Sequence, residues 1–497
     1  MAVGPARRKL ALALALALAL GLCLAALSAG AADGPAWGAP VPPGEPCATA
    51  PHPDWSPAEK WAWGEICQGK MADFNKRFGA ILPPGQKEAW TGVERERRGL
   101  SAKFIETILL HQPWCGALGR QGVKIQGAHF AADLDLTSAD IAHMLWLEKS
   151  RFEEGFAADN VNMAKTLSLE GSCLAKVTIV NTNIAMVLAI SGQAQVLQGL
   201  VLDNLRVGST LYLDNSRFQT ACLSLASIGG WLSLAKTHVD KSLILMASQV
   251  GGHIDLDESR LPDTVFREVR AAGAVTMKSA DFGRAKSLDL RDSQVGTVIC
   301  DGLERWPAEL KLDRFTYQYI GGMGQGEGAE RMTDWPAARF VHWLARQNDY
   351  SPQPYEQCAK VLREAGQPDK ADDVLFAGRE HERREAWKDR KFRWLGMTML
   401  WGVIGYGLGE GYFRSLIWAS MFVWIGACVA NAARVGPERG FLWLLGFSLA
   451  KLLPLVKYGD EFDRDVHGWP QVYFMFHQFM GWALASFIVA GLSGLTK

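Results

Sequence analysis

Acidic and histidine side chains are the groups in this chain best suited to catalysis. Five aspartates stand where they could line one face of the fold, and carboxylates so placed can act on a glycan: Asp135, Asp255, Asp257, Asp289 and Asp292. The histidines are scattered along the chain: His111, His129, His143, His238 and His253. The sequence carries no phosphate-binding, serine-hydrolase, zinc-peptidase or Cys-x-x-Cys motif. We predict no catalytic residue, no metal ligand and no cofactor. A membrane-associated enzyme, oxidoreductase or glycan-active, with an unrecognised site is the alternative.

The cysteines suggest a structural disulfide near the N-terminus. Cys47, Cys67 and Cys115 lie in a region that we expect to be exported, where disulfides persist, and we expect Cys47 to pair with Cys67. Their spacings match no zinc site. The cysteines of the central region, predicted to be packed small residues, are Cys173, Cys222 and Cys300.

Two polar residues, Lys451 and His477, lie in apolar stretches near the C-terminus. Ionisable side chains within a membrane are costly and often functional, so these are the candidate intramembrane polar residues. In a small ion-conducting pore formed by the C-terminal helices, they would line the path. In the structural alternative, Lys451 reaches toward the membrane surface and His477 hydrogen-bonds a neighbouring helix.

A repeat of eleven residues organises the central region. Two successive units show it: Leu200, Leu202 and Val207, then Leu211, Leu213 and Phe218. Residues two apart share a face of a strand but not of a helix. The spacing therefore predicts a mainly β chain, with a parallel, right-handed, quadrilateral β-solenoid over residues 121–315. It also predicts that one row of leucines is buried along a single axis: Leu202, Leu213, Leu234, Leu245 and Leu256.

Small residues accompany this repeat. One usually stands two positions before the third apolar residue of a unit, as Ser216 and Thr237 do. The pattern resembles the pentapeptide-repeat family, in which four faces make one coil, the apolar residue fills the axis and the small residue fits the corner. Two units would give a looser coil here, of about 22 residues. We expect Gly229-Gly230 and Gly251-Gly252, at unit junctions, to permit tight corners.

Three segments are predicted before the solenoid. Residues 1–31 begin with basic residues, continue as an Ala/Leu run and end in small residues, which is typical of a signal peptide. Residues 32–55 form a Pro- and Gly-rich linker. Residues 56–120 are predicted to be a helical cap over the first coil, because an open solenoid end exposes apolar edges.

Two segments are predicted after it. Residues 330–390 form a helical hairpin similar to a tetratricopeptide unit. Residues 394–497 form a membrane domain with about three spans, and its first apolar stretch, 394–408, lies at the interface. The candidate spans are residues 415–431, 441–456 (the shortest, and able to be half-inserted instead) and 471–492.

Charge placement predicts an orientation for this domain. With an exported solenoid and three spans, Arg434 and Arg439 would face the cytoplasm and the acidic loop 460–465 would face out. The predicted location is the bacterial inner membrane, with the solenoid on the periplasmic side.

The predicted order of signal, cap, solenoid, hairpin and spans is similar to that of a group of uncharacterised bacterial membrane proteins with pentapeptide-like repeats. Some of them carry the label membrane-associated oxidoreductase, but the resemblance implies an architecture and supplies no catalytic residues. The formal net charge of zero indicates no preference for nucleic acid. We predict a membrane-anchored, exported β-solenoid that acts as a binding or scaffolding module at the cell envelope. Its partner would be a protein or an envelope polymer, and oligomerisation is open.

Overall fold

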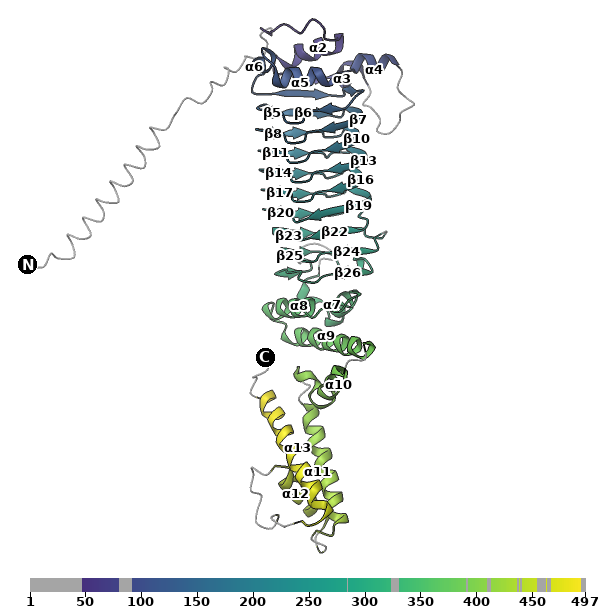
Figure 1. Cartoon of the computed structure of the whole chain (residues 1–497), viewed down its shortest axis with the longest axis vertical. Helices are drawn as coiled ribbons and strands as arrows, with labels where there is room; N and C mark the ends of the chain where they lie inside the picture. The colour runs from purple at the N-terminus through teal and green to yellow at the C-terminus, as the bar shows by residue number, and fades with distance from the viewer. Residues whose placement is uncertain are drawn as a thin grey trace, which may run out of the picture.

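The computed structural model describes residues 47–79, 92–283, 285–322, 330–389, 392–408, 413–435, 438, 440–453, 462 and 466–492. The predicted signal peptide, most of the linker, and Arg439 with the acidic residues of the loop 460–465 lie outside these residues. The described parts follow one another along one long axis: helices, a β-solenoid, more helices and a helical bundle (Figure 1).

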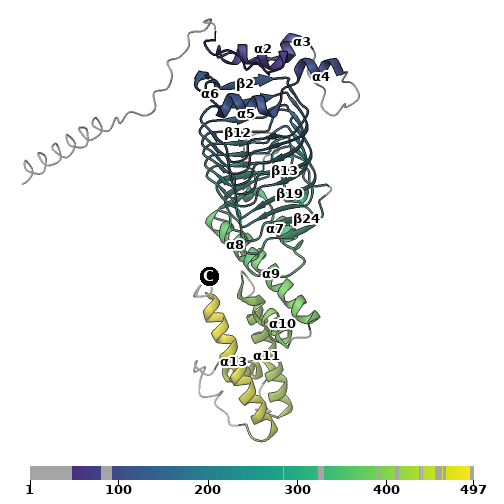
Figure 2. The same ribbon diagram turned by 45° about the horizontal axis from the view of Figure 1, so that its top comes forward.

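The solenoid makes about nine turns over residues 123–320 and consists of parallel strands, as the repeat predicts. Val123 pairs with Leu145, 22 residues later, and Asn183 pairs with Arg206, 23 residues later. One coil is therefore two eleven-residue units. The sheets contain 17 and 10 strands, and the stacked coils are seen from the side in Figure 1 and obliquely in Figure 2.

The strands are short, because each coil turns several corners. The 17-stranded sheet contains β1 (Ala72–Asp73), β2 (Val123–Gln126), β5 (Asp140–Ile141), β6 (Leu145–Glu148), β8 (Asn162–Met163), β9 (Leu167–Ser168), β11 (Asn183–Ile184), β12 (Leu188–Ala189), β14 (Arg206–Val207), β15 (Leu211–Tyr212), β17 (Ser227–Ile228), β18 (Leu232–Ser233), β20 (Gln249–Val250), β21 (Ile254–Asp255), β23 (Arg270–Thr276), β25 (Gln294–Ile299) and β27 (Tyr319–Ile320). The ten-stranded sheet contains β3 (His129–Phe130), β4 (Leu134–Asp135), β7 (Arg151–Ala157), β10 (Cys173–Thr178), β13 (Gln195–Val201), β16 (Arg217–Cys222), β19 (His238–Met246), β22 (Thr264–Arg267), β24 (Ser287–Asp289) and β26 (Glu309–Lys311).

Apolar side chains fill the interior of the coils. The predicted row, Leu202, Leu213, Leu234, Leu245 and Leu256, is at most 1% exposed, so this prediction is confirmed. Full burial of one such leucine contributes roughly 2 kcal/mol. The buried cluster is continuous from Trp55 to Val374. The helices at both ends of the solenoid therefore share its core.

Buried hydroxyl groups explain the small residues at the corners. Ser248 Oγ donates to the Leu223 carbonyl oxygen at 2.6 Å and accepts from the Ala226 N–H at 3.1 Å. Ser293 makes the equivalent two contacts, with Phe266 and Val269, two coils later. Each hydroxyl therefore joins two coils, and it satisfies a buried N–H that would otherwise be costly.

Left-handed residues turn the corners. Positive φ angles recur once per half-coil, mostly at non-glycine residues: Lys149, Asn160, Asn181, Asn204, Asn215, Leu225, Lys236, Ala247 and Glu258. Gly229-Gly230 and Gly251-Gly252 lie at bends between consecutive strands, as expected, but they turn the chain without a positive φ. Successive coils also touch there, and a side chain on Gly251 would overlap the Gly229 carbonyl oxygen.

Short helices cover the first coil, and Figure 2 shows α2 and α5 lying across it. They are α2 (Pro57–Ile66), α3 (Phe74–Phe78), α4 (Gly92–Arg98), α5 (Ala102–Leu110) and α6 (Trp114–Ala117). Ser56 and Glu59 form a capping box at the start of α2, and β1 pairs with β2, which adds a strand to the first coil. Aromatic and aliphatic side chains of these helices join the solenoid core, which shields its end from water.

The last coil is covered by α7 (Ala337–Leu344), α8 (Gln353–Glu364) and α9 (Pro368–Lys388), with the 3₁₀ turns η2 (Leu303–Arg305) and η3 (Met332–Asp334) beside them. Trp343 of α7 packs edge-on against Trp306 at 5.3 Å. α9 lies across the long axis (Figure 1).

A helical bundle ends the described chain. It contains α10 (Arg393–Ile404), η4 (Gly405–Gly407), α11 (Phe413–Ala432), α12 (Phe441–Leu452) and α13 (Trp469–Leu492). α11 and α13 are long and apolar enough to cross a membrane. α12 has 12 residues and is about 18 Å long, against roughly 30 Å for the hydrocarbon core. The described chain thus has two helices of spanning length, where the sequence predicts about three.

Candidate functional site

The acidic and histidine residues do not form one site. Asp289 pairs with Arg291 at 2.6 Å, Asp292 pairs with Arg314, and Asp257 accepts from the Lys278 N–H at 2.8 Å. Asp135 accepts from the Thr137 N–H, and Asp255 accepts from Thr276 Oγ1. Each carboxylate thus stabilises its own neighbourhood. Within the described ranges, no three His, Cys, Asp or Glu side chains are grouped to hold a metal ion.

The histidines likewise have separate local partners. His129 is buried and lies 3.1 Å from Glu153, while His238 lies 3.1 Å from Asp240. His253 Nδ1 accepts from a backbone N–H at 2.9 Å. Burial lowers the pKa of His143, helped by Lys165. His111 lies 3.7 Å from Glu106.

The structure joins Cys47 and Cys67 in a disulfide that closes a separation of 20 residues. Cys115, Cys222 and Cys300 carry free thiols, and Cys173 is half-buried in β10. Burial raises the pKa of the Cys300 thiol to about 12, so this group stays protonated and unreactive at neutral pH.

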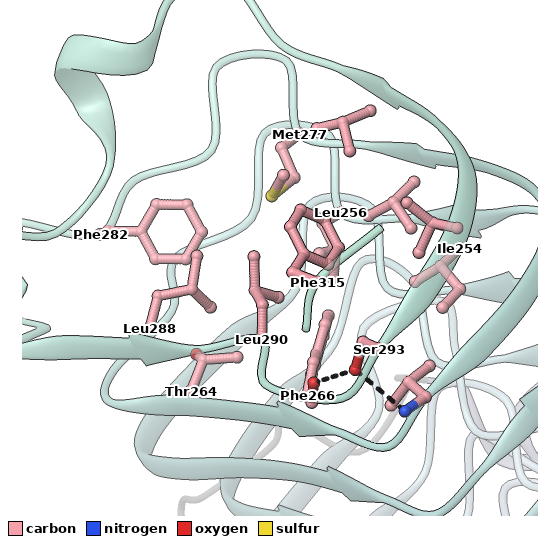
Figure 3. A pocket seen from close by; sticks show the side chains of 14 residues that line it. Ile254, Leu256, Thr264, Phe266, Met277, Phe282, Leu288, Leu290, Ser293 and Phe315 are labelled. Atoms are coloured by element: carbon pink, nitrogen blue, oxygen red, sulfur yellow. Dashed lines mark hydrogen bonds between the residues drawn. The ribbon is translucent and has the colours of Figure 1, made fainter. Parts of the chain in front are cut away.

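An enclosed space inside the later coils is too small for a ligand. Its volume is about 20 Å³, and the side chains around it are almost all apolar (Figure 3). The hydroxyl of Ser293 faces this region but is engaged with Phe266 and Val269, as the dashed lines in Figure 3 show. A space of this size without free polar partners is a dry packing gap.

A groove of about 530 Å³ on the outer face of the solenoid is a stronger candidate, and we call it the lateral groove. It crosses β17, β20, β23 and β25, and its lining residues are Ser227, Ile228, Gly229, Gln249, Val250, Gly251, Arg270, Ala271, Ala272, Gln294, Val295, Gly296 and Gln318. The repeat brings residues distant in sequence to equivalent positions: Gln249 pairs with Arg270, and Arg270 with Gln294. Glycine and alanine form its floor, and exposed polar side chains stand along it.

The polar side-chain groups along this groove are available to a ligand. Gln249, Arg270 and Gln294 are exposed, and none of the three makes a side-chain hydrogen bond or ion pair with another described residue. Earlier coils differ at the equivalent positions. There Asn162 bonds Asp140, and Asn183 bonds Asn162, both at 2.9 Å. The later coils therefore present free amide and guanidinium groups where the earlier ones consume theirs.

An aromatic side chain stands beside the lateral groove. Trp231, two residues after Gly229 of the floor, is 55% exposed. Its ring packs edge-on against His253, with ring centres 5.1 Å apart, and rests over Gly252. The site thus combines hydrogen-bonding heads with an exposed, fixed aromatic face.

Searches against protein-family models, curated proteins and solved structures found no match. The assignment of a function therefore depends on the geometry of the chain itself.

Backbone donors of the groove floor are engaged within the solenoid at Gly229 and Gly251. The N–H groups of Gly229 and Gly251 donate to Val207 and Ile228 of the preceding coil, each at 2.8 Å, and the N–H of Gly252 donates to Gly230 at 2.8 Å. A peptide could not pair with these groups as an added strand. Recognition in the groove must therefore use side chains.

The two candidate intramembrane residues lie in the bundle but serve different purposes. His477 is fully buried: Nε2 lies 3.1 Å from the Ser448 carbonyl oxygen, and Nδ1 lies 3.3 Å from the Tyr473 hydroxyl. Lys451 is partly buried in the last turn of α12, its Nζ 5.7 Å from the Phe447 ring centre. A positive charge at the C-terminal end of α12 interacts favourably with the helix dipole. The contact of His477 with Ser448, in contrast, connects α13 to α12.

Contacts between α12 and α13 show that the two helices run in the same direction. Phe447 packs on Phe474, Ser448 contacts His477, and Leu452 touches Gly481. The numbers rise together along both helices. α12 therefore starts at the same end as α13 and stops about halfway along it.

The sequence does not single out the lateral groove. Most of its polar residues directly precede inward-facing apolar residues. Taken singly, each is interpreted as an ordinary solvent-exposed side chain. The available signal is a run of polar residues in one register of the repeat: Asn162, Asn183, Arg206, Ser227, Gln249, Arg270 and Gln294. Whether such groups bond one another or remain free depends on side-chain length and stacking, which the spacing does not reveal.

Proposed function

We propose that this protein is a membrane-anchored β-solenoid that binds an extended, hydroxyl-rich polymer of the cell envelope in the lateral groove. The free polar groups of Gln249, Arg270 and Gln294, one from each of three successive coils, are the observation that carries the proposal. The similarity to uncharacterised bacterial membrane proteins with pentapeptide-like repeats supports the envelope location. The rod provides the scaffold, and the apolar helices α11 and α13 provide the anchor.

The chemistry of the groove favours a polar polymer over a protein partner. Amides both donate and accept hydrogen bonds, which suits hydroxyl groups. Protein interfaces are rich in aromatic residues and methionine at their centre, whereas the groove lining contains neither. Trp231 at its edge offers a flat apolar face for one ring of a sugar chain, and successive coils repeat the polar heads about 4.8 Å apart.

A triple variant, Gln249→Ala/Arg270→Ala/Gln294→Ala, tests the groove. The full-length protein in detergent should sediment with purified, insoluble peptidoglycan sacculi. Loss of three hydrogen bonds of about 1 kcal/mol each should weaken this binding at least tenfold. The matched control, Gln198→Ala/Gln219→Ala/Lys241→Ala, changes the same kinds of residue on the other sheet and should bind normally.

Two results would overturn the polymer proposal. One is a wild-type protein that stays in solution, or a triple variant that sediments equally well. The other comes from a photo-crosslinking amino acid at Gln249 in living cells: adducts with a protein alone would assign the groove to a protein partner.

The bundle also predicts a topology. α11 leads away from the solenoid, and α13 returns beside it, so that its last turns reach the level of α10 (Figures 1 and 2). Because α12 extends only about halfway along α13, we expect the chain to cross the membrane twice. The turn containing Arg434 then faces the cytoplasm, which agrees with the positive-inside rule.

We expect a reporter fused after Lys497 to lie on the same side of the membrane as the solenoid. Alkaline phosphatase at this position should be active, and a fluorescent protein that matures only in the cytoplasm should be dark. A fusion at Arg434 should show the reverse. Reporters that place the C-terminus opposite the solenoid would exclude two crossings and support three.

A further inference from the structure

The helix that precedes the first apolar span is itself apolar and largely uncovered. In α10, Leu395, Met399, Leu400 and Trp401 are exposed, and Phe392 directly before it is 92% exposed. Only Met397 and Ile404 of α10 are buried. A soluble segment rarely exposes so many large apolar side chains together, so this face is an interaction surface.

α10 is fixed in place by its neighbours. The Trp401 carbonyl oxygen accepts from Arg414 at 2.7 Å, and the Gly402 carbonyl oxygen accepts from Trp418 Nε1 at 2.9 Å, which ties α10 to α11. On the other side, Tyr406 donates to Glu380 of α9 at 2.8 Å. The surface is therefore held rigidly where the solenoid meets the bundle.

Basic side chains border the apolar surface. Guanidinium groups of Arg383 and Arg414 lie 5.5 and 5.2 Å from the Trp401 ring centre. Burial alone would raise the pKa of Glu380, but hydrogen bonds from Arg383 and Tyr406 hold it below its ordinary value, so the carboxylate stays charged beneath Arg383.

The described residues from the second half of α9 to the start of α11 carry a net positive charge. Between residues 379 and 414, the described chain has six Arg or Lys and four Asp or Glu. Arg384 is exposed and forms no ion pair or hydrogen bond with a described residue, and Lys388, 68% exposed, contacts only Glu385 among them. Arg384 and Lys388 are thus the basic groups most open to a new anion.

We propose that α9 and α10 form a lipid-binding collar, in which α10 lies in the membrane interface and Arg384 and Lys388 bind anionic phospholipid headgroups. The surface adjoins α11, and an apolar helix with tryptophan and nearby basic groups fits the boundary between headgroups and acyl chains. The collar rests on the anchoring part of the proposed function. It fixes the height of the solenoid above the bilayer and favours anionic lipid around the first span.

Lipid retention tests the collar. The full-length protein is inserted into lipid nanodiscs that contain equal amounts of phosphatidylcholine and phosphatidylglycerol, and the lipids that remain bound are counted by native mass spectrometry. The wild type should retain phosphatidylglycerol preferentially. Each basic residue near an anionic surface strengthens attraction by a factor of about five, so Arg384→Gln/Lys388→Gln should lower the retained ratio about 25-fold.

A matched double variant controls for charge alone. Lys176→Gln/Lys241→Gln removes two exposed charges from the solenoid and should leave the ratio unchanged. A photo-crosslinking amino acid at Phe392 should form adducts with lipid. Equal retention of both lipids, or no lipid adduct, would overturn the collar while leaving the anchor intact. A chain that does not insert into the nanodiscs would overturn both.

Discussion

Replacing Gly251 by alanine should destabilise the coils in the middle of the solenoid. A methyl group there would overlap the Gly229 carbonyl oxygen of the preceding coil, and backbone within a hydrogen-bonded stack cannot move aside cheaply. The Gly251 N–H also donates to Ile228 at 2.8 Å, a bond that the displacement would stretch. We expect a loss of about 3 kcal/mol in the free energy of unfolding.

The damage should be local, because a solenoid is stabilised coil by coil. Hydrogen exchange of the full-length protein in detergent should rise around Gly229, Gly251 and Gly273, with little change near Val123. Gly119→Ala is the control: a methyl group at Gly119 meets nothing within 4 Å, and this variant should exchange like the wild type. Unchanged exchange in Gly251→Ala would show that the coils tolerate the overlap.

The solenoid could be predicted from the sequence because one physical requirement repeats in it. Each half-coil must place apolar residues inward, so Leu202 and Leu213 recur with the same spacing, and the spacing suffices to exclude a helix. The spacing is less regular between Phe152 and Leu200: Met163 and Ile184 are 21 residues apart, and Ile184 and Val207 are 23. The structure shows that the same strands continue through this stretch.

Corner geometry and site chemistry could be predicted less well. Corners take left-handed conformations even at Leu225 and Ala247, because stacking with neighbouring coils outweighs local preference. The glycines therefore mark close approach between coils, which is a property of the three-dimensional stack. The lateral groove likewise arises from how Gln249 and Gln294 stand over a floor of glycine and alanine, and no single stretch of sequence contains that arrangement.

The packing of α12, which ends about halfway along α13, depends on Gly481 of α13. A methyl group on Gly481 would overlap the Leu452 carbonyl oxygen at the end of α12. Alanine normally stabilises a helix by about 1 kcal/mol relative to glycine. A destabilising effect of this substitution would therefore indicate the overlap with α12. We expect Gly481→Ala to destabilise the bundle by about 2 kcal/mol as α12 is pushed away. Gly396→Ala in α10, where a methyl group meets nothing within 4 Å, should be neutral or stabilising.

Ser448 offers a direct readout of this displacement. It is fully buried between α12 and α13, beside His477, so a cysteine at this position should resist a membrane-permeant maleimide. In the Gly481→Ala background, Ser448→Cys should react, while in the Gly396→Ala background it should stay protected. Exposed Cys428 provides the positive control for labelling in every sample. Protection in all backgrounds would mean that α12 is not seated against Gly481, and the argument for two crossings would lose its main contact.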